Sequence, residues 1–127
     1  MSENKKISKT NLKFNVDHLI PIVVQDKATQ IVLMFAYARL EDINETVQTG
    51  YAVFYSRSRG KRWKKGEEKS GNTLIVHETR RNCNDDSLLY IVTQNKPEAG
   101  FCHTGASTCF FPVSNRTTES KRIETQV

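Results

Sequence analysis

The sequence predicts a single α+β domain that is rich in antiparallel strands and has one or two helices. The chain has 127 residues, which is enough for one hydrophobic core and too few for two. Several short apolar runs end at polar turns, as strands do, and one segment has helical periodicity. Hydrophobic residues make up only 37% of the chain, which favours a domain with polar ends or a subunit that completes its core by dimerising.

The first half of the chain is predicted to form a β-hairpin and then a helix. Residues 19–24 and 31–38 are apolar runs on either side of a short polar connection, which predicts two paired strands. Residues 39–49 have apolar side chains at helical spacing, and Gly50 follows as a stop signal. The apolar stripe is Leu40, Ile43 and Val47, and the side chains expected to face water are Glu41, Asp42 and Glu45.

The second half is predicted to contain three more strands, at residues 51–55, 72–79 and 87–93, with a loop at 56–71. Cys83 then falls in the bend between the last two strands, and His77 is expected on a strand surface. The predicted organisation is a loose arm at residues 1–11, the domain at 12–113, and a polar tail at 114–127. That tail is either loose or a short peripheral helix.

Composition limits the partners and the compartment. The net charge of +5 and the pI of about 9.2 favour an anionic partner, such as a nucleotide, a nucleic acid or a phosphorylated metabolite. No stretch approaches the roughly 18 apolar residues that span a bilayer, and the N-terminus lacks the apolar segment of a signal peptide. Together with an odd number of cysteines, these features predict a cytoplasmic protein with reduced thiols and no membrane partner.

The cysteines are candidate metal ligands. Cys83, Cys102 and Cys109 are the only three in the chain, and the loop between the last two contains a His, a Gly and two Thr. Such a turn-rich loop can direct both sulfurs toward one point. Three thiolates fill three corners of a tetrahedral zinc site and leave the fourth for water or substrate, as in catalytic sites. The alternative is three small core residues, because no C-x-x-C pair is present.

Residues 56–71 are the most basic segment, with seven Lys or Arg, one Trp, three Gly and three Ser. Arg57 and Arg59 can each grip phosphate oxygens with two N–H groups, and Ser56, Ser58 and nearby backbone N–H groups can add neutral donors. Basic residues around Trp63 also suit single-stranded nucleic acid. The simpler alternative is a solvated loop in which Trp63 anchors the core.

Two motifs are specific when they occur together. Residues 56–67 contain Ser-Arg-Ser-Arg, Trp and Lys-Gly-Glu in that order, and residues 102–110 contain Cys-His-Thr-Gly and Cys-Phe. Shorter motifs that fit the same pattern occur in order from about residue 19 to residue 111. In this combination the chain resembles the phosphoribosyl-AMP cyclohydrolase family.

The resemblance implies a cytoplasmic, intertwined homodimer of α+β subunits with active sites at the dimer interface. The implied reaction is the third step of histidine biosynthesis. Water hydrolyses the N1–C6 bond of the adenine ring in 1-(5-phosphoribosyl)-AMP, and the ring opens to the formimino carboxamide ribotide. The implied zinc ligands are Cys83 from one subunit and Cys102 and Cys109 from the other.

The reaction suggests roles for the remaining residues. Phosphoribosylation at N1 makes the adenine ring cationic, and a zinc-activated water supplies hydroxide near neutral pH. His103, next to a ligand, is expected either to shuttle the proton or to orient a cysteine. Arg57, Arg59 and Lys65 are expected to neutralise the two phosphates of this small nucleotide substrate.

The chain departs from the family at the magnesium motif. The family word is Asp-Cys-Asp-x-Asp, whereas this chain reads Asn82-Cys83-Asn84-Asp85-Asp86, so Asp86 alone keeps a carboxylate at a family position. Mg²⁺ usually depends on one or two carboxylates. The sequence therefore predicts intact zinc binding, at Cys83, Cys102 and Cys109, and weakened or absent magnesium binding at Asn82, Asn84 and Asp86.

Several functional hypotheses remain open at the level of sequence. The chain is a divergent but active cyclohydrolase, or a catalytically impaired relative, whether natural or engineered. A non-enzymatic nucleotide- or RNA-binding module is the alternative from another class, and nucleic acid is the less expected partner. A structural dimer held by zinc lies between these hypotheses.

Overall fold

The computed structural model describes residues 12–67 and 70–114. The predicted arm at residues 1–11 and residues 115–127 of the predicted tail lie outside the described residues. The elements, in chain order, are β1 (Ile20–Asp26), β2 (Val32–Ala38), α1 (Leu40–Thr49), β3 (Val53–Ser56), β4 (Lys61–Lys64), β5 (Leu74–Arg81), β6 (Leu88–Gln94) and the 3-10 helix η1 (Pro97–Ala99).

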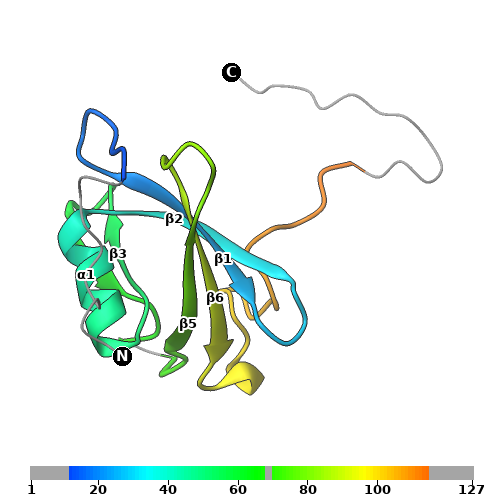
Figure 1. Ribbon diagram of the computed structural model, residues 1–127. Helices are drawn as coiled ribbons and strands as arrows, with labels where there is room; N and C mark the ends of the chain where they lie inside the picture. The colour runs from blue at the N-terminus through cyan, green and yellow to red at the C-terminus, as the bar shows by residue number, and fades with distance from the viewer. Residues whose placement is uncertain (1–11, 68–69, 115–127) are drawn as a thin grey trace.

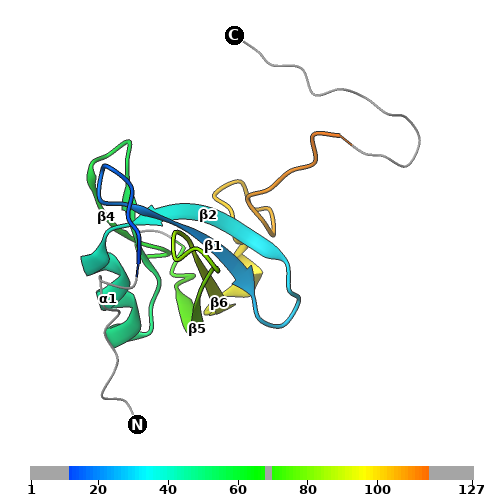
Figure 2. The ribbon, with the colours of Figure 1, turned by 45° about the horizontal axis from the view of Figure 1, so that its top comes forward.

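The strands form one curled sheet in the order β4-β3-β2-β1-β6-β5. Neighbouring strands are antiparallel except β1 and β6, which are parallel. The segment before β3 also meets β5, because the Ala52 N–H donates to the Leu74 carbonyl at 3.0 Å and the Val76 N–H to the Gly50 carbonyl at 2.8 Å. Figures 1 and 2 show α1 on one side of this sheet, where it packs against β2, β3 and β5.

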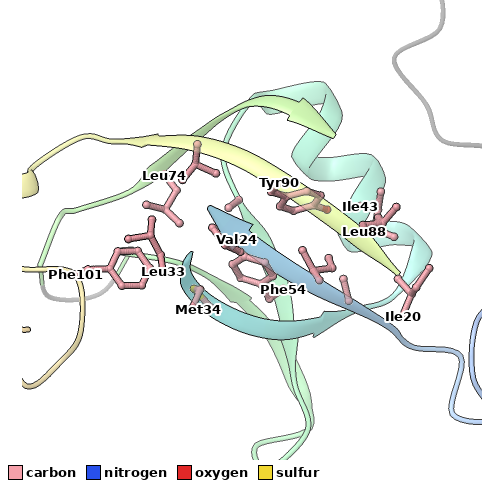
Figure 3. Close-up of a cluster of buried hydrophobic side chains, with 14 of the residues drawn as sticks. Ile20, Val24, Leu33, Met34, Ile43, Phe54, Leu74, Leu88, Tyr90 and Phe101 are labelled. Carbon is pink, nitrogen blue, oxygen red and sulfur yellow. The ribbon is translucent and has the colours of Figure 1, made fainter. Parts of the chain in front are cut away.

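The hydrophobic core lies on the inner side of the curled sheet, and α1 covers one end of it (Figure 3). Phe54 and Tyr90 are fully buried and stack with their ring centroids 6.1 Å apart. Ile43 of α1 and Phe101 of the loop after η1 belong to the same cluster. Because burial of a large apolar side chain stabilises a fold by roughly 1.5–3 kcal/mol, Phe101 ties its loop to the core.

Most predicted elements are confirmed. The described part is a small, mostly antiparallel domain with one α-helix, and the predicted hairpin is the β1–β2 pair. The α1 helix ends at Gly50, which adopts a left-handed conformation with φ of 86°. His77 is exposed on β5, where its Nε2 lies 2.9 Å from Thr93 Oγ1. In this part of the chain, no helix combines the length and apolar character needed to span a bilayer.

Two predictions are wrong in detail. Residues 61–64, predicted as loop, form β4, because they pair with β3 and Trp63 packs against the core. Asp42, predicted to face water, is 1% exposed. Its carboxylate accepts hydrogen bonds from the backbone N–H of Arg39 at 2.9 Å and from the Arg39 guanidinium at 2.8 Å, which offset the loss of solvation.

Gly66 and Gly50 provide a matched test of the close contact between the segment after β4 and the backbone of Asn72. Both have positive φ, but a Cβ on Gly66 would lie 2.4 Å from the backbone of Asn72, and a Cβ on Gly50 would meet nothing within 4 Å. A left-handed alanine costs roughly 1–2 kcal/mol. We expect Gly50→Ala to lose about that much free energy of unfolding and Gly66→Ala about 3 kcal/mol or more, because its backbone must also move. Urea denaturation at one protein concentration measures both, and equal losses would contradict the close approach.

Candidate functional site

Cys102 and Cys109 lie on a tight loop that backbone hydrogen bonds hold closed. The N–H groups of Phe101 and Cys102 both donate to the carbonyl of Ala106 at 2.9 Å. Beyond this turn, the Cys109 N–H donates to the Leu33 carbonyl of β2 at 2.8 Å. β3 pairs with β2 only near Tyr37, so this half of the β2 edge is open to the cysteine segment. The loop therefore joins the sheet at one end and the core at the other.

The two thiols of this loop face each other and differ in acidity. Hydrogen bonds from the side chain and backbone of Thr104 lower the pKa of Cys102. Burial of the sulfur, and its hydrogen bond with Cys102, raise the pKa of Cys109 to about 11. Cys102 is buried as a residue, whereas Cys109 is exposed. The two sulfurs therefore lie close together in unequal surroundings.

Lys65 faces this cysteine pair. Its ammonium donates to the Phe101 carbonyl at 3.0 Å and lies 4.5 Å from the centroid of the Phe101 ring. Burial lowers the pKa of Lys65, while the charges of Cys109 and Cys102 act in the opposite direction. The lysine side chain is thus a positive charge held beside two potential thiolates.

Asn72 holds the segment that leads into the cysteine loop, and the sequence analysis did not identify it. The side chain is fully buried. Its Nδ2 donates to Gln94 Oε1 at 3.0 Å and to the Gly100 carbonyl at 3.3 Å, and its Oδ1 accepts from the Lys96 N–H at 2.7 Å. These partners lie more than twenty residues away in sequence, so no local pattern points to them.

A cavity of about 390 Å³ opens at the cysteine loop. His103 lies on its wall, with Nδ1 3.8 Å from Cys102 Sγ. Trp63, half-buried against the core, forms another wall, so it serves both as the predicted core anchor and as a surface of the cavity. Other lining residues are Lys65, Gly66, Ser70, Ala99, Gly100, Phe101, Cys102 and Gly105. Residues from both specific motifs therefore meet here.

The Ser-Arg residues lie elsewhere, at the tip of the β3–β4 hairpin. Ser56 pairs with Lys61 and Val53 with Lys64, so the tip and Lys65 are at opposite ends of the hairpin. The Arg57 guanidinium stacks over the Tyr37 ring at 4.0 Å, beside a second cavity of about 810 Å³. Ser56 Oγ accepts from the Arg59 N–H at 3.3 Å and lies 3.5 Å from Ser58 Oγ. One chain therefore does not gather Arg57, Arg59 and Lys65 around a single phosphate.

Cys83 is also separate from the other cysteines. It lies in the turn before β6, as predicted, whereas the loop with Cys102 follows the end of β6 (Figure 1). A strand of seven residues spans roughly 20 Å at about 3.3 Å per residue. Across the described ranges, no three His, Cys, Asp or Glu side chains come close enough to hold a metal ion.

The side chain of Asn82 organises the turn around Cys83. Its Oδ1 accepts from the N–H groups of Asp86 at 2.9 Å and Ser87 at 3.0 Å, and its Nδ2 donates to Asp86 Oδ1 at 2.6 Å. Asp85 has a left-handed backbone with φ of 61° and pairs with Arg81 at 2.8 Å. Both carboxylates of the turn thus have partners within the protein.

Comparison with known proteins places these motifs in one family. A family model described as phosphoribosyl-AMP cyclohydrolase matches residues 34–111. The phosphoribosyl-AMP cyclohydrolase of Methanospirillum hungatei is 45% identical over 112 residues, 88% of this chain and 82% of the relative. That of Archaeoglobus fulgidus is 49% identical over 100 residues, 79% of this chain and 89% of the relative.

Longer relatives match as well. The histidine biosynthesis bifunctional protein HisIE of Aquifex aeolicus is 49% identical over 113 residues, which are 89% of this chain and 52% of that protein. The chain therefore spans about half the length of this bifunctional relative. The match with the family model covers every candidate site residue from Ser56 to Cys109.

Gly100 and Gly105 test how the cysteine loop is closed. Both have positive φ, but a Cβ on Gly100 would lie 2.7 Å from the Gly105 carbonyl oxygen, whereas one on Gly105 would meet nothing within 4 Å. In a chain that keeps only Cys102, we expect Gly100→Ala to speed modification of this buried thiol by about tenfold or more, since overpacking typically costs roughly 1–3 kcal/mol. Gly105→Ala is the control. Reaction with a chromogenic disulfide measures the rates, and equal rates in the two variants would refute this account of loop closure.

Proposed function

The chain belongs to the phosphoribosyl-AMP cyclohydrolase family, and we propose that it opens the adenine ring of 1-(5-phosphoribosyl)-AMP in histidine biosynthesis. Water adds across the N1–C6 bond, and the product is the formimino carboxamide ribotide. The observation that carries the proposal is the cavity in which Trp63 and Lys65 of one motif meet Cys102 and His103 of the other.

Zinc is the proposed cofactor. The donor set suits it, because the sulfurs of Cys102 and Cys109 already lie within hydrogen-bonding reach and soft thiolates favour zinc. When bound, zinc supplies a Lewis acid that lowers the pKa of a water molecule. The third ligand is Cys83 of the partner subunit, since the length of β6 keeps Cys83 of the same chain away from the loop.

The residues of the cavity then have separate tasks. His103 approaches Cys102 with Nδ1, which supports the orienting role, and its Nε2 is the nitrogen that takes the proton from water. Lys65 balances the charge of the thiolates instead of binding phosphate, because its ammonium faces Cys102 and Cys109. The flat indole of Trp63 provides a surface for the purine ring.

Arg57 and Arg59, with Ser56 and Ser58, are the proposed phosphate ligands. They lie at the far end of the β3–β4 hairpin from the cysteine cavity. Four paired positions separate the tip from Lys65, roughly 13 Å at about 3.3 Å per residue. A nucleotide with phosphates at opposite ends matches such an elongated arrangement, in which the ring lies near the cysteines and a phosphate lies near the arginines.

We propose a homodimer with shared active sites, which the separation of Cys83 from the cysteine loop supports. Exposed apolar side chains next to the Cys109 segment support such contact, because burying them against a second copy would remove them from water. These side chains are Val32, Phe35, Phe110, Phe111 and Val113. The cytoplasmic location expected from the sequence remains a prediction.

A mixing experiment tests the enzyme and the shared site together. We expect zinc-loaded wild-type protein to open phosphoribosyl-AMP, as followed by product absorbance, and Cys83→Ser and Cys102→Ser each to abolish turnover. After subunit exchange in an equal mixture of the two variants, about half of the dimers are mixed. One of the two sites in each mixed dimer contains all three cysteines, so turnover returns to about a quarter of the wild-type value.

The matched control mixes Cys102→Ser with Cys109→Ser, two changes within the same half-site. This mixture stays inactive if each site takes Cys102 and Cys109 from the same chain. Recovery in the control, or no recovery in the first mixture, would refute the shared site. Absence of turnover from folded, zinc-loaded wild-type dimer would instead indicate a catalytically impaired relative.

A further inference from the structure

We propose that the Asn82 side chain, in place of a bound divalent cation, positions the Cys83 ligand, so that the zinc site of this chain does not need Mg²⁺. The inference rests on the proposed zinc site. It concerns the turn between β5 and β6, which carries Cys83 and contains the motif where this chain departs from its family.

The orientation of the Asn82 amide is fixed by its neighbours. Its oxygen accepts two backbone N–H groups, those of Asp86 and Ser87. A reversed amide would place its NH₂ group against these two donors, so the nitrogen must face the carboxylate of Asp86, 2.6 Å away. The amide therefore links both sides of the turn. Its oxygen accepts hydrogen bonds from the backbone of Asp86 and Ser87, and its nitrogen donates to the Asp86 carboxylate.

The backbone of the same turn is closed around this side chain. The Asn82 N–H donates to the Ser87 carbonyl at 3.1 Å, and the Asp85 N–H donates to the Asn82 carbonyl at 3.1 Å. The Asp85 carbonyl accepts from the Lys13 N–H at 2.7 Å. Cys83 follows Asn82 directly, so the position of its sulfur depends on the closure that Asn82 provides.

These residues do not fit a magnesium site. Mg²⁺ usually binds through carboxylates. Asp86 already accepts a hydrogen bond from Asn82, and Asp85 is paired with Arg81. Asn84 brings no charge. The oxygen of Asn82, which is the atom a metal would need, is used by two backbone donors.

Restoring an acid at position 82 reverses this arrangement. An aspartate there would place a second carboxylate within hydrogen-bonding distance of Asp86 and remove the NH₂ group that now donates to the Asp86 carboxylate. Two like charges at such a distance repel, and a cation between them relieves the repulsion. In this account the amide of Asn82 and a cation are interchangeable means of satisfying Asp86.

The test measures zinc affinity by competition with a chromophoric chelator, with and without Mg²⁺. We expect the wild-type protein to bind zinc equally in both conditions. Asn82→Asp should lose about tenfold or more in zinc affinity without Mg²⁺, the loss typical when a residue that orients a metal ligand is changed. Added Mg²⁺ should restore much of that loss.

The double variant Asn82→Asp, Asp86→Asn is the matched control. It exchanges the two groups, so an amide can again donate to a carboxylate across the turn. Its zinc affinity should return toward the wild-type value and ignore Mg²⁺. Zinc binding by the wild-type protein that requires Mg²⁺, or an Asn82→Asp variant that keeps full affinity without it, would overturn the inference.

Turnover separates this inference from the proposed function. Zinc binding that ignores Mg²⁺, with no ring opening, would remove the enzyme assignment and leave the role of Asn82 intact. Ring opening by a wild-type protein whose zinc binding requires Mg²⁺ would support the enzyme and overturn the inference.

Discussion

Strand β6 is the constraint on which the arrangement of this molecule depends. It is hydrogen-bonded on both sides, to β1 and to β5, so its two ends are held a strand's length apart. The turn that carries Cys83 lies before it, and the loop that carries Cys102 follows it. Within one chain the two ends are therefore far apart, which supports the proposed site shared between two chains. The exposed apolar surface beside Cys109 supports the same proposal.

The two ends of β6 are held by the same kind of residue. Asn72 ties the cysteine loop to Gln94 at the end of β6, and Asn82 closes the turn at its start. Each side-chain amide both donates and accepts hydrogen bonds, so it can satisfy a neighbouring acceptor and a neighbouring donor without bringing a charge. Charge enters separately: Lys65 lies beside the cysteine pair, and Arg81 beside Asp85. The cysteine segments are thus positioned by neutral groups, and charged groups set the electrostatic environment around them.

Local sequence patterns predicted much of this fold. The apolar runs of β1, β2 and β6 and the stop signal at Gly50 are local features, as is the bend at Cys83. The strand β4 was not predicted, because its residues are mostly basic and resemble a solvated loop. Lys and Arg flank Trp63, the residue that faces the core. Asp42 is buried only because Arg39 meets its charge. Asn72 has partners distant in sequence, and the amide orientation of Asn82 depends on a closed turn, so neither role could be predicted from residue type or spacing.

The parallel pairing of β1 with β6 also affects how the chain folds during synthesis. β1 is made early and can pair at once with β2, but its other edge must wait for residues 88–94. Contacts so distant in sequence slow folding, and an unpaired strand edge invites association with other chains. The nascent chain therefore exposes an apolar β1 edge until almost the whole domain has left the ribosome, and this interval is when the protein is most prone to aggregate or to need a chaperone.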